Sequence, residues 1–186
     1  MFRLDVCLRN EVCSSFVAHF DAALEVLINT VEAGGLEQLT ALEKISFWQR
    51  FETSRNRLPL IDHQLIADAD ASDLAGEYCF SNLKMLLTRK LQLSPAEAAA
   101  RVRAAAAVEL RTSELGEPVD PVLPQLAAAQ RFGQVSTEQV QIVVRAMQKL
   151  DRPDLCPGEV AAVEQQLVKQ ARELGPKTCD WSQIEQ

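Results

Sequence analysis

Apolar residues recur at intervals of three and four positions along most of this sequence, and this periodicity restricts the chain to helices. The spacing is clearest in residues 10–33, where one face carries Phe16, Phe20, Ala23, Leu24, Leu27 and Val31. No segment alternates apolar and polar residues as a half-buried strand does. Aromatic residues, which favour strands, make up only 5% of the chain. The pattern therefore predicts an all-α fold.

Glycine and proline mark where the predicted helices end. Gly34 stops the first long helix, and a second is expected from about Leu36, so that residues 10–57 form an antiparallel helical hairpin. Pro59 predicts a break or kink, after which residues 58–176 form a helical core. We therefore expect a compact multi-helix domain with a long N-terminal helical hairpin.

Short motifs predict boundaries within the helical core. The run ADADASDLAGE (67–77) is rich in small and acidic residues and indicates a linker, which a helix over about residues 77–92 follows. The motif SPAE is a typical helix start, with Ser94 as the N-cap, Pro95 at the first helical position and Glu97 placed to bond back to the cap. We expect this helix to continue to about position 110.

Alanine dominates that helix, with seven alanines at positions 98–100 and 104–107. Small side chains on most sides let neighbouring helices approach closely, which suits a central packing position. At 100° per residue, Arg101 and Arg103 lie on nearly opposite faces, so one row of phosphates cannot easily contact both. Arg101 follows Glu97 by one turn, the favourable order for an ion pair. The pattern favours a packing role, with a nucleic-acid contact surface as the alternative.

Net charge limits which partners the chain can bind. The value of −7 opposes binding to a phosphate backbone unless basic side chains are segregated. Between Ser81 and Arg111, six basic residues against two acidic ones give +4 and leave −11 for the rest of the chain. The candidate nucleic-acid contacts are therefore Lys84, Arg89, Lys90, Arg101, Arg103 and Arg111.

Residues 123–147 combine a short helix, a turn at Gly133 and a second helix that Ser136 caps, which is the order of a helix-turn-helix motif. The second helix is expected to expose a face without net positive charge, made of Glu138, Gln139, Gln141, Arg145 and Gln148. An ordinary helical corner is therefore favoured over a DNA-reading one. Helices are expected to end within about two residues of Gly133 and Gly175.

The sequence contains two histidines, His19 and His63, and none of the motifs that build a hydrolytic, phosphate-binding or metal site. His63 follows Asp62 among apolar residues, which is typical of a hydrogen-bonded structural histidine. The five cysteines include no Cys-x-x-Cys pair, so we expect reduced, mostly buried thiols. We predict no catalytic, cofactor-binding or metal-ligating residue, and no cofactor.

The first residues do not read as a targeting segment. Charges stand where a signal peptide needs an apolar region, at Arg3, Asp5, Arg9 and Glu11. No window approaches the roughly 20 apolar residues that cross a bilayer. We expect a cytoplasmic protein with no membrane partner.

Four stretches together carry a family resemblance: RLPLIDHQLI (57–66), LQLSPAEAAARVRAA (91–105), LGEPVDPVLPQLAAAQRFGQVSTEQVQIV (115–143) and VEQQLVKQARELGP (163–176). They resemble the 13E12 repeat family of actinobacteria, catalogued as domain of unknown function 222. The resemblance covers about residues 15–180. Its most specific residues are Leu93, Ser94, Glu97, Ala98, Arg101, Gly116, Glu117, Pro118, Leu123, Pro124, Gln130 and Gly133.

The resemblance implies an all-helical domain that in many members precedes an HNH endonuclease domain. Members of the family occur as multiple genomic copies, and some are associated with phage integration sites. The HNH histidines and asparagine are not recognised here, so the resemblance implies a chain without nuclease activity. On this interpretation residues 1–14 are an N-terminal segment, residues 15–180 the family domain and residues 177–186 a tail where a nuclease linker would begin. The implied partners are DNA or an HNH nuclease.

Two functions from different classes follow. The first is a non-catalytic helical module that binds DNA weakly or docks a nuclease. The second is a structural protein with no nucleic-acid role, which forms a homo-oligomer through the hairpin of residues 10–57.

Overall fold

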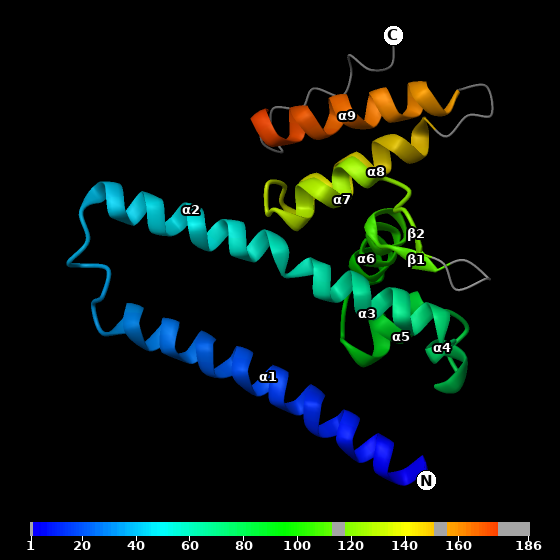
Figure 1. Cartoon of the computed structure of the whole chain (residues 1–186), viewed down its shortest axis with the longest axis horizontal. Coiled ribbons are helices and arrows are strands. Elements are labelled where there is room, and N and C mark those ends of the chain that lie inside the picture. The colour runs from blue at the N-terminus through cyan, green and yellow to red at the C-terminus, as the bar shows by residue number, and fades with distance from the viewer. Residues whose placement is uncertain (1, 113–117, 151–155, 175–186) are drawn as a thin grey trace. The chain divides into compact units, whose positions relative to one another are not determined.

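The computed structural model describes residues 2–112, 118–150 and 156–174, with side chains described over 15–110, 119–150 and 156–173. Within these residues there are nine α-helices and one antiparallel ladder of two-residue strands (Figure 1). The elements are α1 (Phe2–Glu32), α2 (Ala41–Arg57), α3 (Pro59–Ala71), α4 (Leu74–Glu77), α5 (Leu83–Lys90), α6 (Pro95–Val108), β1 (Arg111–Thr112), β2 (Pro118–Val119), α7 (Pro124–Arg131), α8 (Thr137–Lys149) and α9 (Pro157–Leu174). The predicted all-α class is confirmed. None of the described helices is long and apolar enough to cross a membrane.

The chain divides into two units at Gln49 and Arg50, within α2. We call residues 2–49 the arm and residues 50–174 the core unit, and each is described by itself. The predicted C-terminal tail, residues 177–186, lies outside the described part of the chain.

Two capping devices fix the turn between α1 and α2 in the arm. Gly34 has φ +82°, a left-handed conformation that ends α1 and favours glycine. Thr40 and Glu43 then start α2 reciprocally, because the Thr40 N–H donates to Glu43 Oε2 at 2.8 Å and the Glu43 N–H donates to Thr40 Oγ1 at 3.3 Å. Hydrogen bonds from the Thr40 hydroxyl and N–H lower the pKa of Glu43. Because Thr40 caps it, α2 begins at Ala41, five residues after the predicted start at Leu36.

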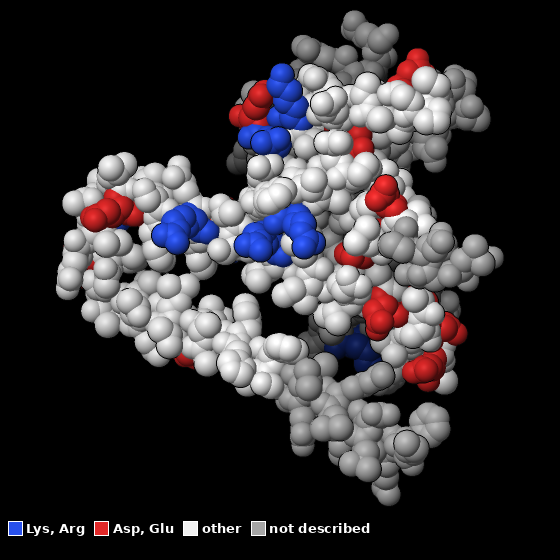
Figure 2. Space-filling view, viewed as in Figure 1, with Lys and Arg blue, Asp and Glu red and all other residues white. Residues whose placement is uncertain are grey.

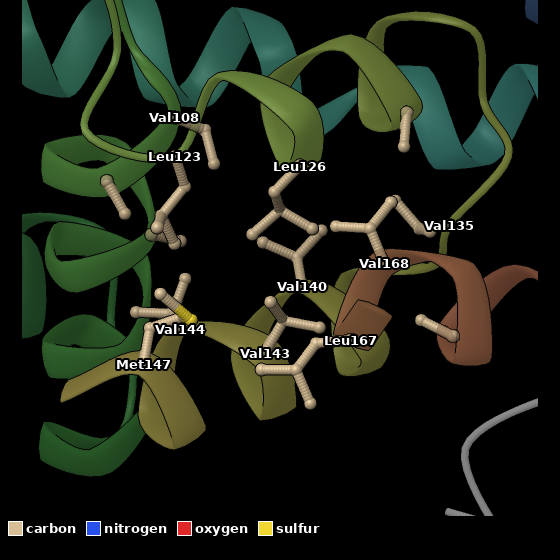
Figure 3. Packing of buried hydrophobic residues seen from close by; sticks show 14 residues of the cluster. Val108, Leu123, Leu126, Val135, Val140, Val143, Val144, Met147, Leu167 and Val168 are labelled. Atoms are coloured by element: carbon tan, nitrogen blue, oxygen red, sulfur yellow. The ribbon is translucent and has the colours of Figure 1, made fainter. Parts of the chain in front are cut away.

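Helix α6 occupies the centre of the core unit, as its alanine content predicted. It packs against α3, α5, α7 and α8. Its alanines serve two apolar clusters: Ala98 and Ala105 join α3, α4 and α5, whereas Ala104 and Ala107 join α7, α8 and α9. In the second cluster, Figure 3 shows the side chains of Leu126, Val140, Val143 and Leu167 converging between the helices. Burying one such side chain fully stabilises the fold by about 1.5–3 kcal/mol.

A buried carboxylate links α9 to the start of α7. Leu123, at the N-cap position, provides no side-chain cap. Glu164 of α9 is buried instead against this end and accepts the Leu126 N–H at 2.9 Å. Burial raises the pKa of Glu164, and backbone hydrogen bonds from Leu126 and Gln125 oppose the rise. One carboxylate thus satisfies N–H groups that a helix start otherwise leaves unpaired.

The predicted linker at 67–77 was wrong, because most of this run is helical. Helix α3 extends to Ala71, since Ile66 and Ala69 continue its buried face, and packing there outweighs composition. The chain actually turns at Asp73, which has φ 51° and accepts the Gly76 N–H to start α4. The helix predicted from 77 begins at Leu83, where the Asn82 side chain caps it by accepting the Met85 N–H at 2.9 Å.

The corner between α7 and α8 requires glycine. Gly133 has φ +68°, and a Cβ there would lie 2.3 Å from the carbonyl oxygen of Thr53 in α2. Asn56 reinforces the contact, because its Nδ2 donates to the Gly133 carbonyl at 3.1 Å. The prediction that helices end near Gly34 and Gly133 is confirmed, and Gly175 lies outside the described residues.

Candidate nucleic-acid interface

The start of α6 holds the first of the candidate arginines by ion pairs. Ser94 accepts the Glu97 N–H at 3.1 Å, as predicted, but the Glu97 carboxylate turns to Arg101 instead of bonding back to the cap. Arg101 Nη1 also donates to Asp62 Oδ2 of α3 at 3.0 Å. The predicted Glu97–Arg101 ion pair is confirmed.

The ion pairs with Glu97 and Asp62 hold Arg101 at the contact between α6 and α3. Its side chain is about one-third exposed. Burial works to lower the pKa of Arg101, but the bond to Glu97 and the charge of Asp62 outweigh it and raise the pKa. These contacts support the packing role that the sequence favoured for this face of α6.

Arg103 emerges on another side of the same helix, into a groove between α6 and α8. The groove has a volume of about 290 Å³ and is lined by Ala96, Glu97, Ala100, Arg103, Gln141, Val144 and Arg145. Two alanines make the α6 wall shallow, and Arg103 and Arg145 supply two guanidinium groups. Arg145 is exposed, and its Nε donates to the Gln141 carbonyl at 3.2 Å. We call this feature the α6–α8 groove.

The groove has a positive charge balance. Among the described residues, no carboxylate forms an ion pair with Arg103 or Arg145. The remaining charged group in the lining, Glu97, is already paired with Arg101. Guanidinium groups match the geometry of phosphate oxygens and bind them through two parallel hydrogen bonds. The groove is therefore suited to a small anionic group of the phosphate class.

The other candidate residues lie elsewhere. Lys84, Arg89 and Lys90 are exposed on α5, and Lys90 Nζ lies 4.9 Å from the centre of the Tyr78 ring. Arg111 is in β1, but its side chain is outside the described part of the structure. The six predicted contacts are thus distributed over the α5 surface, the α3–α6 contact, the α6–α8 groove and β1.

Sequence reasoning missed two basic features. Arg145 was assigned to a face without net positive charge, and no local signal shows that α8 places it opposite Arg103. A second group lies at the end of α2, where Arg55 and Arg57 occupy the last turn and Arg55 pairs with Glu52 at 2.9 Å. Figure 2 shows basic side chains along α2 and acidic ones over α3 and α4. A charge count over residues 44–57 would have found this group.

Helix α8 corrects the predicted exposed face. Gln139 is buried, not exposed, and forms a capping box with Ser136, whose N–H it accepts at 2.7 Å. Its Nε2 donates to the Ala171 carbonyl of α9. The sequence motif located the cap but could not show that the same side chain would bridge to α9.

The two histidines lie in different settings. His19 lies on α1, where its ring Nδ1 is 2.6 Å from the Ser15 carbonyl. His63 is buried on α3 as expected, and the expected hydrogen bond is not formed at its Nδ1, which has no partner. Burial lowers the pKa of His63; the Asp62 charge opposes this and the Arg101 charge adds to it. His63 is therefore neutral at physiological pH.

The predicted burial of the thiols is wrong for the two cysteines whose side chains are described. Cys79 and Cys156 are free thiols and both are exposed. The side chains of the other three, Cys7, Cys13 and Cys179, lie outside the described part of the structure. Over the described residues, no three side chains of His, Cys, Asp or Glu come together in a way that could hold a metal ion.

Comparison with known proteins identifies one family model, described as a domain of unknown function (DUF222), which matches residues 45–180. An uncharacterized protein of Mycobacterium tuberculosis strain CDC 1551 is 35% identical over 131 residues, 68% of this chain and 28% of that protein. A second from the same strain is 31% identical over 173 residues, 90% of this chain and 38% of the relative. A third is 31% identical over 128 residues, which are 67% of this chain and 55% of that relative.

The chain thus spans between about a quarter and just over half of the length of these relatives. No solved structure is significantly similar to it.

Proposed function

The chain belongs to the DUF222 family, and on this premise we propose that it is a non-catalytic helical module that binds the DNA backbone weakly and presents it to an HNH nuclease partner. The observation that carries the proposal is the α6–α8 groove, with two guanidinium groups that no described carboxylate neutralises. We expect the DNA contact to be to phosphate, since the two guanidinium groups of the groove match the geometry of phosphate oxygens.

The charge of the whole chain sets the expected strength of this binding. A net charge of −7 opposes association with DNA, so two arginines give a weak, salt-sensitive complex without base specificity. Each phosphate contact contributes about 0.9 to the slope of log affinity against log salt concentration. A groove that contacts two phosphates accordingly predicts a slope of about −2.

Fluorescence anisotropy with a labelled duplex, read at several salt concentrations, tests the DNA part of the proposal. The double variant Arg103→Ala/Arg145→Ala should bind about tenfold more weakly at low salt and lose most of the salt dependence. Its matched control is Lys169→Ala/Arg172→Ala, which removes the same charge from exposed positions on α9 outside the groove lining. Equal weakening by both variants would exclude the groove as the contact. Absence of binding at low salt would remove the DNA role altogether.

A separate experiment tests the non-catalytic part. Purified protein is incubated with plasmid and single-stranded DNA in the presence of magnesium, manganese or zinc. HNH chemistry needs a metal and a histidine that activates water, and His63 is buried in the α3 packing. We expect no cleavage. Cleavage that survives extensive purification and disappears in His63→Ala or His19→Ala would make these histidines catalytic and overturn the proposal.

A further inference from the structure

The arm carries a series of large apolar side chains that are exposed. Phe16 is 70% exposed, Leu42 77% and Trp48 67%. The other members are Val17, Phe20, Leu24, Val26, Ile28, Val31 and Ile45. Over residues 15–49 the two helices of the arm therefore do not bury their apolar residues against one another. The hairpin predicted from sequence has its helices and its turn, but not a packed interior.

Most of these side chains follow a helical stripe, as the sequence pattern predicted, whereas Val26 lies outside it. At 100° per residue, Phe16, Phe20 and Leu24 fall within 80° on one side of α1, and Leu27 and Val31 fall between them. On α2, Leu42, Ile45 and Trp48 recur at three-residue spacing. A stripe of this kind forms the seam of a helix bundle. Two helices enclose no core of their own, whereas four helices do.

Charge is also divided between α1 and α2. Residues 15–32 of α1 contain Asp21, Glu25 and Glu32 and no lysine or arginine, which gives −3. Helix α2, which continues into the core unit at Arg50, contains Lys44, Arg50, Arg55 and Arg57 against Glu43 and Glu52, which gives +2. The first helix is thus acidic and the second basic. In an antiparallel pair of arms related by a two-fold axis, α1 of each copy would lie beside α2 of the other, with opposite charges adjacent.

The area available is sufficient for a stable pair. Without Val26, the exposed parts of the other nine residues amount to roughly 1,000 Å² when each full residue is taken as about 200 Å². A standard protein–protein interface buries about 800 Å² on each partner. We propose that the arm is a homodimerisation element, in which α1 and α2 of two copies of this chain form an antiparallel four-helix bundle. The proposal does not depend on DNA binding.

Sedimentation velocity of the full chain across the micromolar range tests this directly. The wild type should change from monomer to dimer as its concentration rises. Phe16→Glu, on the stripe, should raise the dimer dissociation constant at least about tenfold, because it places a charge in the centre of the bundle. Val26→Glu is the matched control: Val26 is 67% exposed on the same helix but points 120° away from the centre of the stripe.

Trp48→Glu on α2 provides a second, independent disruption. It should weaken the dimer as Phe16→Glu does, while the melting of the core unit, followed by circular dichroism, stays at the wild-type temperature. A wild type that remains monomeric throughout would overturn the proposal, and the arm would then cover a surface of its own chain or of another protein. Equal effects of Phe16→Glu and Val26→Glu, or association that neither Phe16→Glu nor Trp48→Glu weakens, would also overturn it.

Discussion

The arm and the core unit have the same kind of sequence pattern but different structures. Both place apolar residues every three or four positions, yet Leu126 of the core unit is completely buried whereas Leu42 of the arm is 77% exposed. The difference lies in how many elements meet. Helix α6 has four neighbours that each cover part of it, whereas the apolar stripes of α1 and α2 stay largely exposed over residues 15–49. Amphipathic periodicity predicts a helix. The number of helices packed around it decides whether its apolar face is buried within one chain.

The largest expected contrast comes from truncating matched leucines. Leu126→Ala removes a side chain from the centre of the second cluster and should lower the free energy of unfolding by about 3–4 kcal/mol. Leu42→Ala, on the exposed face of the arm, should change it by less than about 0.5 kcal/mol at protein concentrations below the dimer midpoint, where the arm is unpaired. Urea denaturation followed by circular dichroism measures both. Similar losses at the two sites would mean that the arm is part of the same cooperative fold.

Two capping glutamates give the next contrast. Glu164→Ala removes a buried acceptor at the start of α7 and should cost about 2 kcal/mol. Glu43→Ala removes the exposed cap of α2 and should leave the melting of the core unit unchanged.

Glu164 also predicts a pH dependence with a defined sign. Burial raises its pKa above the ordinary value of 4.5, so the folded state holds this proton to higher pH than the unfolded state does. The stabilisation that comes from this raised pKa is complete below pH 4.5. It is lost as the pH rises through the raised pKa of Glu164 in the folded state. The stability difference between wild type and Glu164→Gln should therefore fall over that range. A difference that grows with pH would contradict the assigned burial.

Replacing one buried polar side chain of the core unit should raise the free energy of unfolding instead of lowering it. Gln130 is completely buried, and neither its Oε1 nor its Nε2 has a hydrogen-bond partner. Gln130→Met keeps a similar volume and removes two unsatisfied groups, so it should raise the free energy of unfolding by about 1 kcal/mol. Urea denaturation under the same conditions measures the gain. A loss of stability would show that the amide has partners in solution.

The smallest expected effect concerns His63. Burial holds its pKa below the ordinary value of 6.5, so the unfolded state takes up this proton first as the pH falls. Stability from this residue is complete above pH 6.5 and is lost as the pH falls toward the lowered value. His63→Gln should remove that part of the acid sensitivity, whereas His19→Gln on the arm should leave it in place. Thermal melts between neutral and mildly acidic pH distinguish the two variants.

Local chemistry made much of the fold predictable. The Ser94 and Ser136 caps, the glycines at 34 and 133 and the central alanine helix all follow from short-range rules. Errors occurred where distant contacts decide the structure. Composition marked 67–77 as a linker, but burial of Ile66 and Ala69 keeps α3 helical.

The candidate site was less accessible to sequence reasoning for the same reason. Counting charge along the chain grouped Arg101 with Arg103, although one is bound to Asp62 and the other lines the α6–α8 groove. Arg145, the second guanidinium of the groove, is 42 positions away from Arg103 along the chain. Only the packing of α8 beside α6 brings them to one groove.

We propose that a second copy of the chain completes the arm, whereas the apolar clusters of the core unit are buried within one copy. Hydrogen–deuterium exchange of the full chain at two protein concentrations, one below and one above the dimer midpoint, tests this most directly. We predict that amides of α6 and α8 are protected equally at both concentrations, and that amides over residues 15–49 become protected only at the higher one. Protection of the arm at both concentrations would contradict the account, as would protection of α6 and α8 that depends on concentration.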